Sequence, residues 1–176
     1  MPDSRSIADE LIRRLDLKPH PEGGFFAETY RSAARVLRAN DTGKPDDTRA
    51  ASTAIYYLLC DGAHSAWHRI RSDEVWHFYA GEPLLVHVLD ESDASGTLVT
   101  HRLGNPLTHP DTVCQAVVAA GLWFAAECAD PASFALVGCT VAPGFEFSEF
   151  ELADVDALKA RHPRHTELIG QLGPAD

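Results

Sequence analysis

The sequence predicts an all-β protein, an antiparallel sandwich or barrel of the jelly-roll type, with helices only at its two ends. Two observations lead to this fold class. Eight short segments of strand-like composition follow one another between residues 24 and 143, and turn residues such as glycine, proline or asparagine bound each of them. No helical pattern separates these segments, so a βαβ arrangement is not expected.

The first twenty residues predict one amphipathic helix. Ile7, Leu11 and Leu15 recur at i, i+4 and i+8, which places them on one helical face. Ser6 precedes this pattern as the candidate N-cap, and the proline-rich sequence KPHP ends it. The helix is therefore expected to pack its apolar face against the body of the protein.

The strand-like segments and two C-terminal helices are expected to complete a single domain. In chain order the segments read GFFAETYRS, STAIYYLLC, SAWHRI, EVWHFYAG, LLVHVLD, TLVTHRLG, CQAVVAAGLWFAAEC and FALVGCTVAP. After residue 150, DVDALKARHP and TELIGQL are typical of short helices that pack on the outside. The polar stretch 38–50 is expected to be a mobile loop. The expected domain covers residues 1–176, with the N-terminal helix in 1–20, the barrel in 21–150 and the helical segment in 151–176.

Composition narrows the class of partner. A chain of 176 residues buries about 70% of its extended surface on folding, so a sizeable core is available. The formal net charge of −11 argues against nucleic-acid binding, which depends on a basic surface. The sequence contains no apolar run of 18 residues, so neither a membrane span nor a secretory h-region is expected. We expect a cytoplasmic protein with a small-molecule partner, no nucleic-acid or membrane partner, and free, buried thiols at its cysteines, which are Cys60, Cys114, Cys128 and Cys139.

The stretch GAHSAWHRIRSDEVWHFYAGEP, residues 62–83, brings histidines, an Asp-Glu pair and two tryptophans around a predicted turn. Side chains alternate faces along a strand, so His64 and His68 are expected on one face and Ser65 on the other. At a rise of about 3.3 Å per residue, the two histidines lie roughly 13 Å apart. They cannot both bind one metal ion through bonds of about 2.0–2.1 Å. His64 is expected at the surface or at the rim of a pocket.

Glu74 is the carboxylate expected to meet His68. A turn at Arg-Ser-Asp, residues 71–73, would return the chain antiparallel and place Glu74 in the cavity that His68 faces. His77 has the opposite parity to Glu74 and is expected on the outer face. His68 and Glu74 are predicted to be metal ligands or an acid/base pair. The alternative is that His68 is a core histidine paired with a neighbouring carboxylate.

The spacing within this stretch resembles the first motif of the cupin superfamily. In that motif a glycine, five residues, His-x-His, three or four residues, a glutamate, six residues and a glycine follow in order. Gly62, His68, Glu74 and Gly81 have this spacing, and Ile70 replaces the second histidine. The second cupin motif, Pro-x-Gly-x-x-His, is similar to AAGLWF at residues 119–124, in which only the glycine is kept.

The resemblance is closer to the cupin-5 group, whose members are largely uncharacterised. It extends over nearly the whole chain, through HPEGGFFAETYRS, STAIYYLL, HRIRSDEVWHFYAGEPL, GLWFAA and GCTVAPGFEFSEFEL. It implies the RmlC-like cupin jelly roll, as a barrel or sandwich with an N-terminal helix and short C-terminal helices. It also implies a homodimer.

A further likeness concerns PEGGFFAE, which is similar to the D-x-R-G-x-F-x-E strand of sugar-nucleotide 3,5-epimerases on the same fold. In those enzymes the strand helps to hold the nucleotide across the dimer, and a cavity histidine acts as general base. Phe26 and Glu28 match this pattern, but Gly23 stands where the epimerases have arginine. Arg31 and Arg49 are possible substitutes for phosphate recognition, the alternative for both being ordinary surface ion pairs.

These residues give an acid/base hypothesis. His68 is expected to be the base, Glu74 its partner, and Tyr56 or Tyr30 the acid on the other face. For both tyrosines the alternative is core packing with a satisfied hydroxyl. The residues expected to bind the substrate are Phe26, Glu28, Arg31, Trp76 and Gln115.

A divalent metal is the competing hypothesis. A typical cupin site uses three histidines and a glutamate, and only His68 and Glu74 of that set are kept. Tight binding would need a recruit such as Gln115 or His77. We therefore expect a small-molecule-binding cupin that needs no cofactor, an enzyme that isomerises or epimerises a small sugar-like or carbonyl metabolite. The alternatives are a non-catalytic binding cupin and a metal-dependent cupin enzyme with a reduced ligand set.

Overall fold

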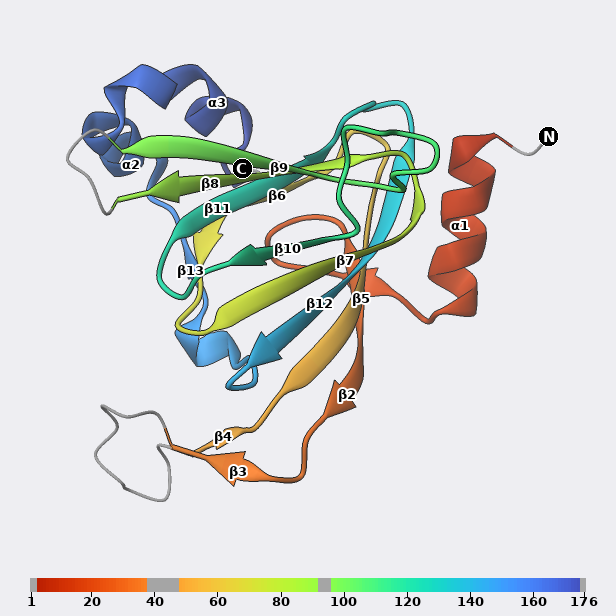
Figure 1. Cartoon of the computed structure of the whole chain (residues 1–176), viewed down its shortest axis with the longest axis horizontal. Helices are drawn as coiled ribbons and strands as arrows, with labels where there is room; N and C mark the ends of the chain where they lie inside the picture. Colours follow the sequence, from red (N-terminus) through yellow and green to blue (C-terminus); the bar gives the residue numbers. More distant parts are fainter. Residues whose placement is uncertain (1–2, 38–47, 92–95, 175–176) are drawn as a thin grey trace.

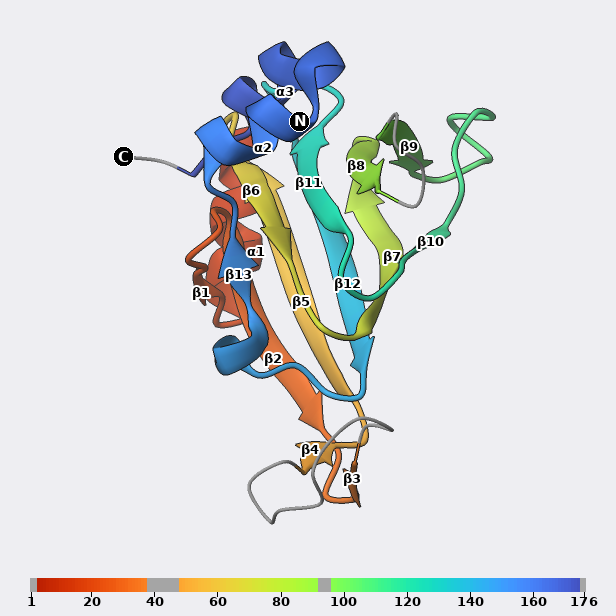
Figure 2. The ribbon, with the colours of Figure 1, turned by 90° about the vertical axis from the view of Figure 1, so that its left-hand side faces the viewer.

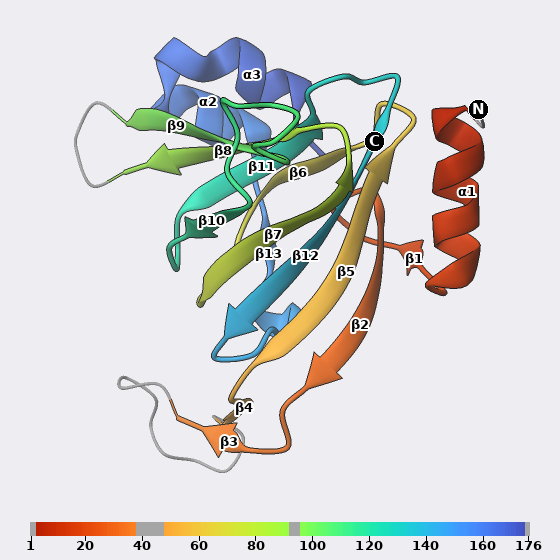
Figure 3. The same cartoon turned by 45° about the vertical axis from the view of Figure 1, so that its right-hand side comes forward.

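Two antiparallel sheets face each other in the computed structural model, which describes residues 3–37, 48–91 and 96–174 (Figure 1). In spatial order the six-stranded sheet contains β1 (Lys18–Pro19), β2 (Phe25–Arg31), β5 (Thr53–Cys60), β12 (Phe134–Ala142), β7 (Asp73–Gly81) and β10 (Gln115–Val118). The five-stranded sheet contains β13 (Glu151–Leu152), β6 (His64–Arg69), β11 (Trp123–Cys128), β8 (Leu84–Asp90) and β9 (Thr97–Leu103). A small pair of strands, β3 (Arg35–Val36) and β4 (Arg49–Ala50), extends beyond the ends of β2 and β5 (Figure 3). The predicted all-β class is confirmed.

The helices lie at the two ends of the chain, as the sequence predicts. They are α1 (Ser4–Arg14), α2 (Val155–Arg161) and α3 (Thr166–Gln171), with short 3-10 turns at Phe147–Glu149 and Pro163–His165. Asp3 is the N-cap of α1 in place of Ser6, because its carboxylate accepts the backbone N–H of Ser6 at 2.8 Å. None of the helices in the described ranges is long and apolar enough to cross a membrane.

Each helical layer covers the outer face of one sheet. Figure 2 shows α2 and α3 beside β6 and β11, where Leu158 and Ile169 pack against Trp67. On the six-stranded sheet, α1 packs against Leu58 and Leu136. Strand residues that point away from the barrel are therefore buried wherever a helix lies over them.

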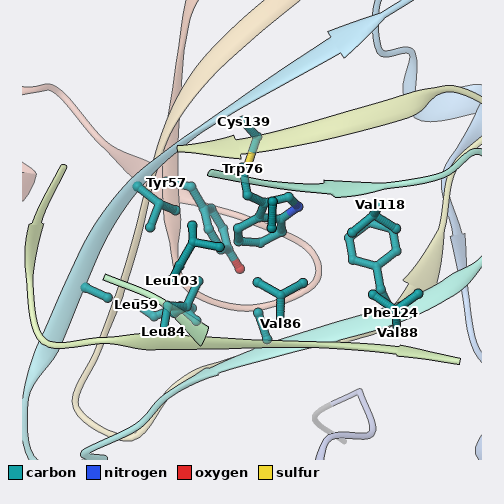
Figure 4. Packing of buried hydrophobic residues seen from close by; sticks show 14 of the residues in the cluster. Tyr57, Leu59, Trp76, Leu84, Val86, Val88, Leu103, Val118, Phe124 and Cys139 are labelled. Carbon is teal, nitrogen blue, oxygen red and sulfur yellow. The ribbon is translucent and has the colours of Figure 1, made fainter. Parts of the chain in front are cut away.

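The main core fills the space between the sheets. Tyr57, Trp76 and Phe124 are its largest members, and their rings meet edge to face at centroid distances of 6.0 and 6.3 Å (Figure 4). Val86 and Leu103 close the core from the five-stranded sheet. This packing fixes the strands whose other residues line the pocket described below.

The hairpin expected between β6 and β7 does not form. The two strands belong to different sheets, since β6 pairs with β11 and β13 while β7 pairs with β10 and β12. Residues 70–72 therefore cross from one sheet to the other. His68 and Glu74 still line one pocket, but they reach it from opposite walls.

A β-bulge in β6 changes the expected alternation of its side chains. His68 pairs with Phe124 and Ser65 with Ala126, so two residues of β6 oppose a single residue of β11. As a result Ser65 and His68 point to the same side, where the sequence predicted opposite faces. Trp67 points outward instead, and its indole N–H donates to the carbonyl of Leu168.

Two other expectations need correction. The segment CQAVVAAGLWFAAEC is not one strand: it turns at Gly121, whose φ is 81°, and divides into β10 and β11 in different sheets. The cysteines are free as expected, but Cys114 is exposed because it precedes the edge strand β10. The stretch expected to be a mobile loop, residues 38–50, lies mostly outside the described residues, and its last two residues form β4.

Candidate functional site

A pocket opens between the two sheets, at the side where β2, β5, β6 and β7 approach the segments around residues 20 and 146. The empty space inside it and at its mouth amounts to about 670 Å³. Its wall combines apolar and aromatic side chains with a small group of charged or titratable ones. The charged residues and histidines are His20, Glu22, Glu28, Arg31, His68, Glu74 and Glu146, and Tyr57 and Cys139 also line the pocket.

Glu22 is the carboxylate that contacts His68. Its Oε2 lies 3.1 Å from His68 Nε2, and its Oε1 accepts a 2.8 Å hydrogen bond from the hydroxyl of Ser65. Both side chains of the pair are almost fully buried, at 8% and 4% exposed. The bulge in β6 makes this possible, because it turns Ser65 and His68 toward the same carboxylate.

The geometry around His68 fixes where its protons lie. Nδ1 is 2.7 Å from the carbonyl oxygen of Ala66, which can only accept, so Nδ1 carries a proton. Nε2 lies within ion-pair distance of Glu22 Oε2, and this contact can hold one further proton, on nitrogen as imidazolium beside carboxylate or on oxygen beside neutral imidazole. Phe124 and Phe150 hold the ring at centroid distances of 4.0 and 5.3 Å. The pair is therefore a positioned proton donor and acceptor.

His20 lies next to this pair as a neutral ring. The backbone N–H of Glu22 donates to His20 Nδ1 at 3.3 Å, so this nitrogen is unprotonated. Burial lowers the pKa of His20, which agrees with a neutral imidazole whose proton sits on Nε2. The ring packs edge-on to Phe26 at 4.6 Å and stacks with Phe147 at 5.8 Å.

Two glycines bring Glu22 into the pocket. Gly23 and Gly24 have φ of 111° and 67°, values that other residues rarely adopt. A Cβ on Gly23 would lie 2.1 Å from the carbonyl oxygen of His64, so the chain passes directly over β6 here. The backbone of Glu22 accepts the N–H of Ala66 at 2.8 Å, which fixes this crossing.

The hydroxyl of Tyr57 secures the same crossing from the opposite sheet. It donates to the carbonyl of Gly23 at 2.8 Å, and burial raises its pKa well above the usual range. The phenol therefore keeps its proton and its hydrogen bond to the carbonyl of Gly23. Its role in the site is to hold the backbone next to Glu22.

Glu74 faces the pocket from the other wall and is buried, at 8% exposed. Burial raises the pKa of its carboxyl to about 8, and the nearby Glu22 carboxylate adds to this shift. At neutral pH Glu74 is therefore mostly protonated, while the Glu22–His68 pair lies across the pocket. A protonated carboxyl on one wall that faces a glutamate–histidine contact on the other is an arrangement suited to acid/base chemistry.

The raised pKa of Glu74 gives a pH-dependent stability with a defined sign. The folded state holds the proton up to about pH 8, whereas the unfolded chain loses it near pH 4.5, so stability falls as pH rises between these values. Glu74→Gln removes this pH-dependent loss of stability. Each unit of difference between the folded and unfolded pKa corresponds to about 1.4 kcal/mol in the free energy of unfolding. Urea unfolding at pH 5 and pH 8 should show the variant gaining on the wild type at the higher pH. An equal difference at both pH values would contradict the raised pKa.

The predicted site residues separate into two groups. Five of them line the pocket: Phe26, Glu28, Arg31, His68 and Glu74. In this pocket Glu22, and not Glu74, contacts His68, and Glu28 is paired with Arg31 at 2.7 Å. The carboxylate that contacts His68 is therefore a different one from the carboxylate that the sequence predicted.

The structure places the other predicted residues outside the pocket lining. Tyr56 points to the outer face of β5, with its ring 5.9 Å from that of Tyr79, because the side chain of Tyr57 takes the inner face. Trp76 lies in the core between Tyr57 and Phe124. The exposed Gln115 donates to His77 Nδ1 at 2.9 Å on the outer face.

The structure also places two further histidines and a second tyrosine that the sequence singled out. His77 also bonds Thr140 Oγ1 at 3.0 Å, which agrees with its expected position on the outer face. The exposed Tyr30 is not part of the pocket lining. His64 is half-buried, and its Nε2 lies 2.8 Å from the carbonyl of Gly173.

Sequence reasoning missed Glu22 and His20. Both lie in HPEGG, between the N-terminal helix and the first long strand, where prolines and glycines indicate only a turn. The signal available was a pair of glycines directly after two ionisable residues. Such a pair permits a close backbone approach, which can carry those side chains into a cavity.

The residues that the structure describes do not form a cupin-type metal site. In the described ranges, no group of three or more His, Cys, Asp or Glu side chains is arranged to hold a metal ion. The recruits considered from the sequence, His77 and Gln115, face the opposite side of the six-stranded sheet. His68 and Glu74 thus gain no third ligand from either of them.

A jelly-roll sandwich with a pocket between its sheets defines the cupin class of fold. The oxalate decarboxylase of Bacillus subtilis shares it with a TM-score of 0.52 and 16% identity, over 90% of this chain and 37% of that one. At this identity the likeness concerns the fold alone. The RmlC-like cupin fold expected from the sequence is confirmed.

The chain belongs to the Cupin_5 family of the cupin superfamily (DUF985), whose model matches residues 9–153. A hypothetical protein from Leishmania major is 32% identical with a TM-score of 0.83, over 96% of this chain and 99% of that one. Protein SO0799 from Shewanella oneidensis is 35% identical with a TM-score of 0.81, over all of both chains. The uncharacterized protein YML079W of Saccharomyces cerevisiae is 28% identical, over 90% of this chain and 82% of its own length.

Proposed function

We propose that this protein is an enzyme that isomerises or epimerises a small polar carbonyl metabolite by acid/base proton transfer. The observation that carries the proposal is the buried contact of 3.1 Å between Glu22 Oε2 and His68 Nε2 inside a pocket. A positioned base within reach of a bound substrate is the minimum that proton abstraction next to a carbonyl requires. Relative to the sequence-based hypothesis, His68 changes from base to partner, Glu22 becomes the base, and Glu74 takes the role of acid that a tyrosine was expected to have.

The proposed chemistry uses both walls of the pocket. With the shared proton on His68, the Glu22 carboxylate accepts a proton from the carbon next to the substrate carbonyl. Glu74, protonated on the opposite wall, donates to the carbonyl oxygen as negative charge develops there. Return of the proton to the other face of the same carbon, while the enol hydroxyl gives its proton back to Glu74, gives epimerisation. Return of the proton to the former carbonyl carbon, while the neighbouring hydroxyl gives its proton to Glu74, gives isomerisation.

A solvent-exchange experiment tests this proposal without knowing the product. Small hydroxy-carbonyl compounds are incubated with the protein in D2O, and deuterium at the carbon next to the carbonyl is followed by NMR. The wild type is expected to catalyse exchange on at least one compound, and His68→Gln and Glu74→Gln should reduce it by about 10²–10⁴-fold. His77→Gln is the matched control, because this histidine lies on the outer face of the sheet.

The same experiment separates the alternative function. A compound that stabilises the protein against heat but shows no exchange would favour a non-catalytic binding cupin. Unchanged exchange in both pocket variants would contradict the acid/base proposal. The homodimer implied by the family resemblance stays a prediction.

A further inference from the structure

We infer that the pocket takes an uncharged, sugar-type hydroxyl and carbonyl compound and rejects the phosphorylated or carboxylated forms of such compounds. This inference deepens the proposed function of the same pocket and rests on it. It concerns the charge of the substrate, which the proton-transfer chemistry leaves open. The residues at the mouth of the pocket supply the argument.

Arg31 is the one arginine among the described residues that line the pocket, and its guanidinium already has partners. Its Nε and Nη2 donate to the two oxygens of Glu28 at 2.9 and 2.7 Å, and its Nη1 donates to Glu146 Oε1 at 2.9 Å. Nη2 also donates to the carbonyl of Phe145 at 3.2 Å. Four of the five guanidinium N–H groups therefore have partners, and two of those partners are carboxylates. A phosphate would have to displace these carboxylates to obtain the paired hydrogen bonds that arginine normally gives it.

The other titratable groups of the lining do not replace this arginine. His20 is a neutral ring, and any positive charge on His68 is matched by Glu22 at 3.1 Å. Two further carboxylates, Glu28 and Glu146, face the single guanidinium. An anionic ligand would thus enter a site whose described groups carry at least as much negative as positive charge.

Arg49, the second arginine considered for phosphate recognition, is directed elsewhere. Its Nε and Nη2 donate to Glu149 Oε1 at 3.0 and 2.8 Å, and its Nη1 donates to the carbonyl of Thr48. It is not part of the pocket lining. The epimerase-like strand therefore keeps its phenylalanine and glutamate here without a phosphate-binding arginine.

The same wall suits a neutral compound rich in hydroxyl groups. Carboxylate oxygens are strong acceptors for hydroxyl donors and can accept more than one hydrogen bond, and Glu22, Glu28 and Glu146 line the pocket. The aromatic side chains of Phe26 and Phe147 offer apolar surface for the C–H faces of a small ring or chain. Hydroxyl groups, a carbonyl and C–H faces occur together in an unphosphorylated sugar.

The first test changes the charge at the pocket mouth. Inorganic phosphate is titrated by calorimetry into the wild type, a Glu28→Gln/Glu146→Gln double variant, and a charge-matched Glu10→Gln/Glu151→Gln control. Glu10 and Glu151 pair with arginines outside the pocket. In the pocket variant Arg31 loses its two carboxylate partners. This variant alone is expected to gain affinity for phosphate, by about tenfold or more over the wild type. Saturable phosphate binding by the wild type that is lost in Arg31→Gln, or no gain in the pocket variant, would overturn the inference.

The second test compares free aldohexoses and ketohexoses with their phosphate monoesters on the wild type. Tighter binding of a free sugar than of its ester, by about tenfold or more, is the expected result. The reverse order, or no saturable binding of any free sugar at millimolar concentration, would overturn the assigned class. Such a failure is distinct from failure of the proposed function, because solvent exchange on other carbonyl compounds would still depend on His68 and Glu74.

Discussion

Glu22→Gln is expected to lower proton transfer by about 10²–10⁴-fold while the protein keeps its fold. The glutamine amide can still accept the hydrogen bond from the Ser65 hydroxyl, and its other end stays next to His68 Nε2. It cannot take up a proton at neutral pH. The variant therefore removes the base and leaves the geometry in place.

The measurement is the rate of deuterium incorporation, compared with thermal unfolding of the same samples. Glu151→Gln serves as the control, because its carboxylate pairs with Arg69 at the surface outside the pocket. The expected pattern is a large loss of exchange in Glu22→Gln alone, with similar melting temperatures in all three proteins. Exchange within a few-fold of the wild type would remove Glu22 from the proposed chemistry.

Gly23→Ala is expected to destabilise the protein by about 3 kcal/mol or more, the sum of backbone strain and overpacking. The added Cβ would lie 2.1 Å from the carbonyl oxygen of His64, and the φ of 111° would force an alanine into a rarely populated region. Relief of this clash must move the backbone that carries Glu22 away from β6. The variant should therefore also lose the contact between Glu22 and His68.

Gly121→Ala is the matched control for this effect. Gly121 also has a positive φ, 81°, but a Cβ there would meet nothing within 4 Å. Its cost is expected to be the backbone strain alone, about 1–3 kcal/mol. The difference between the two destabilisations, measured by urea unfolding, gives the cost of the clash between Gly23→Ala and β6. Equal destabilisation would contradict the close approach of Gly23 to β6.

Local sequence patterns were sufficient for the fold class but not for the connections between strands. Alternation and turn residues located the strands, and the apolar spacing of residues 7–15 located α1. The same patterns cannot tell a hairpin from a crossover: they predict a hairpin turn at residues 71–73, whereas the chain crosses there from one sheet to the other. A turn of three residues has a similar composition in both cases, and the choice depends on packing between the sheets.

The candidate site was predictable only in part for a related reason. The cupin spacing located His68 and Glu74, which lie within seven residues of each other. Glu22 lies far from them along the chain, and two glycines and a bulge in β6 bring it to His68. Side-chain period in a strand is two residues, so a single bulge or a one-residue error changes the face. The choice of Tyr56 from the sequence is such a one-residue error, because Tyr57 lies at the pocket and Tyr56 lies on the outer face.

The measurement that tests the central claim most directly is ¹⁵N NMR of the His68 imidazole in the wild type and in Glu22→Gln. The account predicts a protonated Nδ1 in both proteins, and an Nε2 resonance that moves strongly when the carboxylate is replaced, because Nε2 shares its proton with Glu22. Replacement of His77 with glutamine should leave that resonance unchanged. An Nε2 signal that is the same with and without the Glu22 carboxylate would contradict the proton-sharing pair on which the proposed function depends.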